Sequence, residues 1–241
     1  MNIKKLLVGG VSGALILGAL AIPAFAGDLF QNANNWKILD RVVLPNGGVN
    51  FMTRHPDALP VGGTTFSLLK ASQGYTSYQI LNYNKDLTDK TITAVVKANL
   101  GFGSFVANPA GCSSGGVAAV GIQFQDTSAG AYDSNDYWWS TDRRNLDTLG
   151  SSTTLTASLA NADRSGWINQ SGKPATDGTE DWVQWQGDIV HMSPYDGFTK
   201  AREDVKEVNL SFGDQCAYAR GVAVSEVGDA SFDLESFTIT P

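Results

Sequence analysis

The chain has 241 residues, of which 24 are acidic and 17 are basic, so its formal net charge is −7 at pH 7. A protein with this negative net charge repels the phosphate backbone of nucleic acids, which argues against nucleic-acid binding as the main function. The length fits one large β domain as well as two small ones, and no linker-like stretch divides the chain.

The first 26 residues have the layout of a cleavable secretory signal peptide. A short basic start precedes an apolar stretch over 6–22, and an A-x-A pattern follows at 24–26. A retained membrane anchor is the alternative, but glycines dilute the stretch and no basic cluster follows it. We therefore expect cleavage after Ala26, no membrane insertion of the mature chain, and a secreted, extracellular or periplasmic location. Residues 27–241 then form a single domain.

The two cysteines, Cys112 and Cys216, both lie in glycine-rich stretches. In an exported protein a lone pair favours a disulfide, which would stabilise the domain by a few kcal/mol in the chain-entropy model. A metal-binding pair or a catalytic thiol is the alternative. Either one needs partners, and the two histidines, His55 and His191, stand alone in the sequence.

Short runs of β-branched and aromatic residues recur along the mature part, whereas helical periodicity is almost absent. The clearest strand is 91–98, where alternate residues face opposite sides, and 208–212 alternates apolar and polar residues before Gly213. The expected strands cover 36–44, 64–70, 75–82, 90–99, 117–125, 136–141, 152–159, 183–190, 206–212, 217–225 and 230–239.

One stretch, 194–206, instead has the spacing of a short helix. Phe198, Ala201 and Val205 recur at intervals of three and four, and Asp196 is a candidate N-cap. Eleven strands and one short helix predict an all-β fold, a two-sheet antiparallel sandwich.

The carboxylates form no recognisable catalytic pattern. Glycoside hydrolysis needs two carboxylates that face one sugar ring, and the chain has no E-x-D-x-x-E run to place them on one strand face. Glu203, Asp204, Glu207 and Glu235 are more simply explained as solvated acids. No G-x-S-x-G turn is present, and each histidine is best explained as structural. Distant acids can still converge, so a secreted hydrolase or lyase stays an alternative.

All six tryptophans belong to the mature part of the chain. Three aromatic residues are consecutive at 137–139, so on a strand Trp138 must point away from Tyr137 and Trp139. One face is then core, and the other is either buried too or an exposed aromatic plane. An exposed plane beside amides suits sugar, because the C–H faces of a pyranose ring stack on it while hydroxyls take hydrogen bonds.

The other candidate tryptophans lie in polar, loop-like stretches, where ligand-binding residues are common. Packing in the core is the alternative for each of them. The predicted ligand-binding residues are Trp138, Trp139, Trp167, Trp182 and Trp185, with Asn169, Gln170, Gln184 and Gln186 as hydrogen-bonding neighbours.

Two parts of the chain resemble a known group of folds. The stretch 208–213 followed by 230–239 resembles the closing strand pair of galactose-binding-like jelly rolls, the fold of many carbohydrate-binding modules. With the 136–140 motif and the two glycine-flanked cysteines, the layout is also similar to secreted bacterial β-sandwich proteins of no assigned activity. The resemblance implies a jelly-roll sandwich with a non-catalytic binding role.

The resemblance also implies a possible structural Ca²⁺, since such modules often hold one between the first and last strands. Asp233 lies in the matching closing strand, and Asp28 or Asp40 is the candidate partner from the opening strand. No other cofactor is required. We expect an exported, non-catalytic protein whose partner is a polysaccharide or glycan. The alternatives are a structural cell-envelope protein without a small ligand, and a secreted glycoside hydrolase or lyase.

Overall fold

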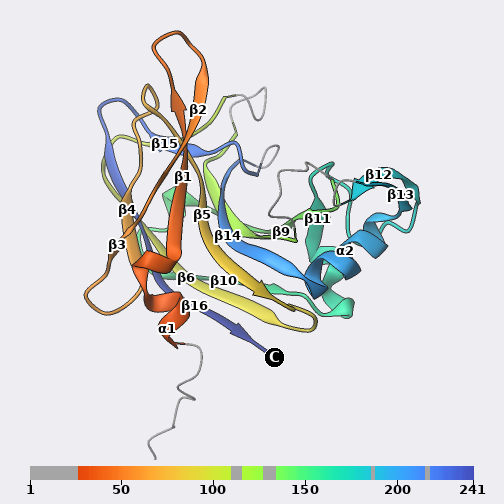
Figure 1. Ribbon diagram of the computed structural model, residues 1–241. Coiled ribbons are helices and arrows are strands. Elements are labelled where there is room, and N and C mark those ends of the chain that lie inside the picture. Colours follow the sequence, from red (N-terminus) through yellow and green to blue (C-terminus); the bar gives the residue numbers. More distant parts are fainter. Residues whose placement is uncertain (1–26, 110–115, 127–133, 186–187, 215–217) are drawn as a thin grey trace, which may run out of the picture.

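The computed structural model describes five segments of the chain, 27–109, 116–126, 134–185, 188–214 and 218–241 (Figure 1). The stretch predicted to be a signal peptide, 1–26, and both cysteines, Cys112 and Cys216, lie outside the described residues. Within the described part of the chain, no helix is long and apolar enough to cross a membrane.

Most strands belong to two antiparallel sheets, as expected for the all-β sandwich. The larger sheet has the order β11-β9-β8-β14-β5-β1-β2, and β15 and β7 join it through β5. Its strands are β1 (Trp36–Val43), β2 (Val49–Arg54), β5 (Gly74–Lys85), β7 (Phe105–Ala107), β8 (Ala119–Gln125), β9 (Tyr137–Asn145), β11 (Trp167–Asn169), β14 (Val205–Gly213) and β15 (Val222–Val224).

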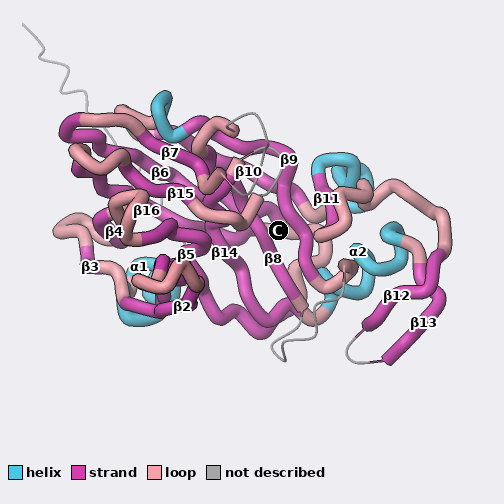
Figure 2. The backbone as a smooth tube through the Cα atoms, turned by 90° about the horizontal axis from the view of Figure 1, so that it is seen from above, coloured by secondary structure: helices cyan, strands magenta, loops and turns pink. Residues whose placement is uncertain are grey.

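The smaller sheet has the order β10-β6-β16-β4-β3 and lies against the larger one (Figures 1 and 2). Its central pair, β6 and β16, is matched over almost the whole length of both strands. Its strands are β3 (Asp57–Ala58), β4 (Thr64–Ser67), β6 (Thr91–Phe102), β10 (Thr153–Ser158) and β16 (Asp229–Thr240).

The core fills the space between these two sheets. Phe212 of β14 lies edge-on to Phe232 of β16, with 4.9 Å between ring centroids, and to Phe66 of β4. Because side chains alternate along a strand, Val208 and Leu210 of β14 share this buried side with Phe212. One face of β14 is therefore apolar and points into the core, whereas the other face is polar.

The larger sheet extends beyond the smaller one, and α2 (Pro194–Glu203) packs on the part left over (Figure 1). Phe198 of α2 contacts the rings of Phe124, Trp138 and Trp167, which come from β8, β9 and β11. The other helices are short: α1 (Gly27–Gln31), η1 (Ala33–Asn35), η2 (Leu146–Thr148) and η3 (Asn161–Gly166).

Three local expectations need correction. The single strand expected at 183–190 is wrong, because β12 (Asp181–Trp185) and β13 (Asp188–Met192) form a separate two-stranded hairpin. The helix expected at 194–206 is confirmed, but it ends at Glu203. Its N-cap is Ser193, whose Oγ accepts a hydrogen bond from the backbone N–H of Asp196.

Candidate functional site

The tryptophans divide sharply by exposure. Trp138 and Trp167 have 0% and 1% of their surface exposed, and Trp139 has 6%, whereas Trp182 is 70% exposed. Trp185 is half-buried and packs against the core cluster. A ring enclosed by protein cannot stack on a sugar from solvent, so exposure separates Trp182 from the other candidates.

The buried tryptophans also use their indole N–H groups inside the protein. Trp138 Nε1 donates to the backbone oxygen of Asn135 at 2.7 Å, and Trp167 Nε1 donates to that of Ser158 at 2.7 Å. Trp139 Nε1 donates to Ser211 Oγ at 3.1 Å. Trp167 was expected in a loop, but it begins β11 and fits the alternative of core packing.

Trp182 lies on the β12–β13 hairpin. It is paired in register with His191 of β13, and the two rings have centroids 5.1 Å apart. His191 Nδ1 lies 2.8 Å from Glu180 Oε2, so the ring beside Trp182 is held by a carboxylate. The result is an exposed aromatic surface on the hairpin, at the end of the molecule opposite α1 (Figure 1).

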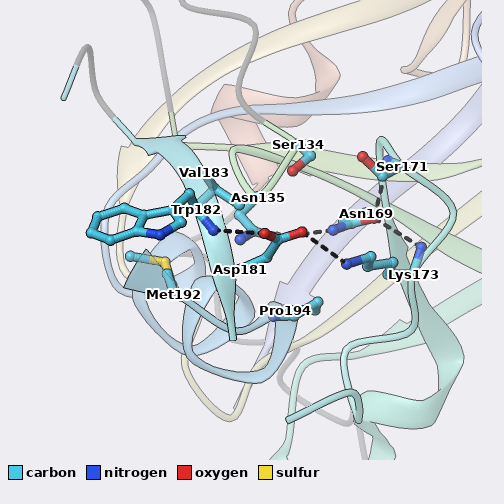
Figure 3. A pocket seen from close by; sticks show the side chains of 10 residues that line it. All are labelled: Ser134, Asn135, Asn169, Ser171, Lys173, Asp181, Trp182, Val183, Met192 and Pro194. Carbon is cyan, nitrogen blue, oxygen red and sulfur yellow. Dashed lines mark hydrogen bonds and ion pairs between the residues drawn. The ribbon is translucent and has the colours of Figure 1, made fainter. Parts of the chain in front are cut away.

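A pocket of about 340 Å³ lies beside this hairpin. Figure 3 shows the ring of Trp182 on one side, next to Met192, and polar groups on the other side. The residues that line it come from the turn before β9, from β11 and the turn after it, from the hairpin and from the start of α2: Ser134, Asn135, Asn169, Ser171, Lys173, Asp181, Trp182, Val183, Met192 and Pro194.

Asn169 organises the polar side of the pocket. Its Oδ1 accepts hydrogen bonds from the backbone N–H groups of Ser171 and Lys173, at 3.0 and 2.9 Å. Its Nδ2 donates to Asn135 Oδ1 at 2.9 Å. The turn that follows contains Gly172, whose φ of +74° lies in the left-handed region that favours glycine. Asn169 is itself buried, so it fixes the wall of the pocket more than it offers free hydrogen bonds.

The charged groups among the described residues that line the pocket are Lys173 and Asp181. Lys173 Nζ lies 3.8 Å from Asp181 Oδ2, and both side chains are well exposed. Asp181 also accepts a hydrogen bond from the backbone N–H of Trp182 at 2.8 Å. Hydroxyl, amide, ammonium and carboxylate groups therefore surround one cavity with an aromatic ring at its edge.

The remaining predicted binding residues are less involved. Gln170 is exposed and follows Asn169, but it does not line the pocket. The side chain of Gln184, on β12, and the whole of Gln186 lie outside the described residues. The structure thus brings together Trp182 and Asn169 from the predicted set.

The expected calcium ligands lie in three different elements, β16, β1 and α1. Asp233, in the smaller sheet, accepts hydrogen bonds from Thr65 Oγ1 at 2.6 Å and from Asn99 Nδ2 at 2.7 Å. Asp40, in the larger sheet, is paired with Arg54 at 2.6 Å. Asp28 lies in α1. Across the described ranges, no group of three His, Cys, Asp or Glu residues is placed to hold a metal ion.

Sequence reasoning missed a second group of polar residues, which lies on the face of the larger sheet that points away from the smaller sheet. Gln123 of β8 and Asn209 of β14 lie side by side in register, and Asn209 Nδ2 donates to Gln123 Oε1. Both are buried, as is Ser211. The signal was available in 208–212, where the polar positions hold an amide and a hydroxyl rather than charges.

Two ionisable groups on this outer face have shifted pKa values. Burial raises the pKa of Glu207, and the nearby charge of Lys37 opposes that shift. Burial lowers the pKa of Arg143 to about 10. The Arg143 guanidinium lies 4.6 Å from the ring centroid of Tyr218 and donates to its backbone oxygen at 3.2 Å. This contact fixes Tyr218 over the sheet.

No model of a protein family matches the sequence, and no curated protein matches it either. Among solved structures, the chain is similar to a xylanase 10C from Cellvibrio japonicus in complex with xylopentaose, at 15% identity and a TM-score of 0.41. That match covers 89% of this chain and 28% of the xylanase, so the chain spans well under a third of the xylanase's length.

Two further solved structures are similar over most of their length. The xylan-binding module CBM15 has 14% identity and a TM-score of 0.37, over 87% of this chain and 94% of that one. Alginate lyase A1-II′, of polysaccharide lyase family 7, has 11% identity and a TM-score of 0.33, over 89% and 98%. Likenesses this distant carry no argument about function, which must come from the side chains.

Proposed function

We propose that the protein is an exported, non-catalytic carbohydrate-binding protein that holds a polysaccharide or glycan at the pocket beside Trp182. The observation that supports it is the exposed Trp182 ring at the edge of a pocket lined by amide, hydroxyl and charged groups. Sugar recognition uses this combination, because an aromatic face stacks on the C–H side of a pyranose while polar groups bond its hydroxyls.

Binding suits this pocket better than hydrolysis does. Hydrolysis of a glycosidic bond requires two carboxylates on either side of it. Of the described residues that line the pocket, Asp181 is the one carboxylate, and it is paired with Lys173. A secreted hydrolase or lyase and a structural envelope protein without a small ligand stay the competing proposals.

The size of the pocket limits what it can hold. About 340 Å³ is near the small end of known ligand sites, which suits a sugar unit or two and leaves the rest of a longer chain in solvent. Trp182 lines the pocket, and the ring of His191, whose centroid lies 5.1 Å from that of Trp182, would extend the contact beyond it. A polysaccharide or an oligosaccharide is therefore a better ligand than a free monosaccharide.

The test is binding by the full chain to a glycan array and to insoluble polysaccharides. Trp182→Ala is expected to weaken binding by about 1–3 kcal/mol, as for other aromatic anchors. Phe51→Ala is the matched control, because Phe51 is also an exposed aromatic residue (57%) but lies on β2, far from the hairpin (Figure 1).

Equal loss in both variants would point to nonspecific adhesion of exposed rings. No binding to any glycan by the unaltered chain would leave the structural alternative as the better proposal. Release of reducing ends or unsaturated products from a polysaccharide panel would favour the enzyme instead.

A further inference from the structure

A pair of buried arginines, neither of which lines the pocket, lies where η3 meets α2. Arg164 of η3 and Arg202 of α2 have only 6% and 3% of their surface exposed. Both guanidinium groups lie against the Phe198 ring, at 5.8 and 5.5 Å from its centroid. The ring of Tyr195 covers Arg164, with its centroid 3.6 Å from the guanidinium carbon.

The two guanidinium groups are neighbours because they share an acceptor. Arg164 Nη2 and Arg202 Nη2 lie 2.5 and 2.6 Å from the same atom, Asn161 Oδ1. Two donors on one oxygen place the two Nη2 atoms within about 5 Å of each other, and like charges so close repel appreciably inside a protein.

Backbone oxygens use some of the remaining donors but not all of them. Arg202 Nη1 donates to the backbone oxygen of Leu159, and Arg164 Nε donates to that of Asn161 at 3.2 Å. Arg164 Nη1 and Arg202 Nε are buried and have no hydrogen-bond partner among the described residues. A buried, unpaired donor on a cation is costly, so each such group calls for an explanation.

Among the described residues, no carboxylate forms an ion pair with either arginine, whereas the exposed Arg144 is paired with Asp142. Burial, followed by the charge of Arg164, lowers the pKa of Arg202. Asp86, Asp89 and Glu203 oppose that shift from beyond ion-pair distance. Two buried positive charges are thus left with carbonyl and amide oxygens alone.

We propose that Arg164 and Arg202 form an oxyanion-binding site, which takes a carboxylate or sulfate group between η3 and α2. A planar guanidinium presents two parallel N–H donors that match two oxygens of such a group, and an anion would supply both the missing acceptors and the missing negative charge. The site lies apart from the Trp182 pocket and goes beyond the binding function proposed for it.

The ring of Tyr195 covers this site on the solvent side. Its side chain is 44% exposed while its ring lies on Arg164, so rotation of one surface side chain uncovers the guanidinium. Rotation of an exposed side chain is fast and requires no change in the backbone of α2. The same oxyanion can be a free ion or the acidic group of a sugar, and the experiment separates these two sources.

The experiment measures thermal unfolding of the full chain against increasing sodium sulfate, with sodium chloride at equal ionic strength as reference. Sulfate raises the Tm of any protein gradually, so the site is measured by a saturable increase at low concentration. Calorimetric titration with sulfate gives the affinity directly. Glucuronate and glucose are compared in the same way.

The saturable increase is expected in the unaltered chain and is expected to be lost, with affinity at least tenfold weaker, in Arg164→Gln and Arg202→Gln. Arg144→Gln is the control, because Arg144 is an exposed arginine that pairs with Asp142. If a glutamine variant does not fold, Arg164→Lys retains the charge without the planar fork and should still weaken binding tenfold.

Saturation by sulfate alone supports a free ion as the source, and saturation by glucuronate but not glucose supports an acidic sugar. Equal responses to sulfate and chloride, or an unchanged response in the glutamine variants, would overturn the proposal. Trp182→Ala should leave the sulfate response unchanged, so failure of the sugar pocket and failure of this site are distinguishable.

Discussion

The sandwich and the β12–β13 hairpin place the same side chain in opposite environments. In the sandwich, Trp138 is enclosed by Phe198 and donates its N–H to a backbone oxygen. In the hairpin, Trp182 has solvent on most of its surface and lies beside the ring of His191. The sandwich uses indole to fill volume, whereas the hairpin leaves it available. The residue type alone therefore does not assign a role to a tryptophan. Its role depends on which elements pack around its ring.

The largest loss of unfolding free energy is expected from Trp138→Ala. Trp138 is fully buried, so truncation leaves a cavity among the aromatic rings below α2 and should cost about 3–5 kcal/mol of unfolding free energy. Denaturant unfolding measures it. A loss below about 1 kcal/mol would mean that this part of the core is not packed as described. The difference in role between the buried Trp138 and the exposed Trp182 would then be contradicted.

A disulfide between Cys112 and Cys216 stays a prediction. Such a bond would raise the free energy of unfolding of the sandwich. The described flanks come close, since a Cβ built on Gly116 would lie 2.3 Å from Asp214 Cβ. Replacing both cysteines by serine should cost about 2–5 kcal/mol of stability. Two thiols that react with a thiol reagent in the unreduced, denatured protein would contradict the bond.

Glu207, at the polar face of β14, should make stability depend on pH. Because its pKa is raised in the folded state, the folded protein binds more protons there, so stability falls as pH rises above the ordinary glutamate pKa. Glu207→Gln should remove this part of the dependence and raise the Tm at pH 7 but not at pH 3. An identical change at both pH values would show that packing, not ionisation, is responsible.

The smallest effect on stability is expected from Trp182→Ala. An exposed side chain contributes little to the core, so the unfolding free energy should change by no more than about 0.5 kcal/mol. Measured beside Trp138→Ala, this variant tests whether binding and packing are separate tasks. Early melting of the Trp182 variant would place its ring in the core and weaken the sugar-site proposal.

The sequence predicted the inner strands well and the periphery poorly. The stretches 91–98 and 208–212 alternate strictly because one face of each is buried, and they became parts of β6 and β14. β2 was missed, since nearly all its residues are exposed and no burial pattern marks it. The hairpin was taken for one strand although Gly187 interrupts the range, a turn signal that the apolar residues on both sides obscured.

For the candidate site, the sequence supplied residue types but not their neighbours. Trp182 and Asn169 meet because β11 and the hairpin converge, which no local pattern encodes. Trp167 and Asn169 are separated by one position in the same strand and both are buried, yet only Asn169 lines the pocket. The arginine pair was beyond sequence reasoning, because Arg164 and Arg202 meet only through the packing of α2 on η3.

Within the part of the chain that the structure describes, the hairpin that bears Trp182 forms a two-stranded sheet of its own. A two-stranded ribbon by itself is marginal in water, so this element depends on side-chain contacts such as that of Trp185 with the core. Its amide protons should then exchange with solvent through local openings that leave the sandwich intact. A ligand that bridges the hairpin and β11 would close these openings, and slower hydrogen exchange in 181–185 and 188–192 would report binding from the protein side without any labelled sugar.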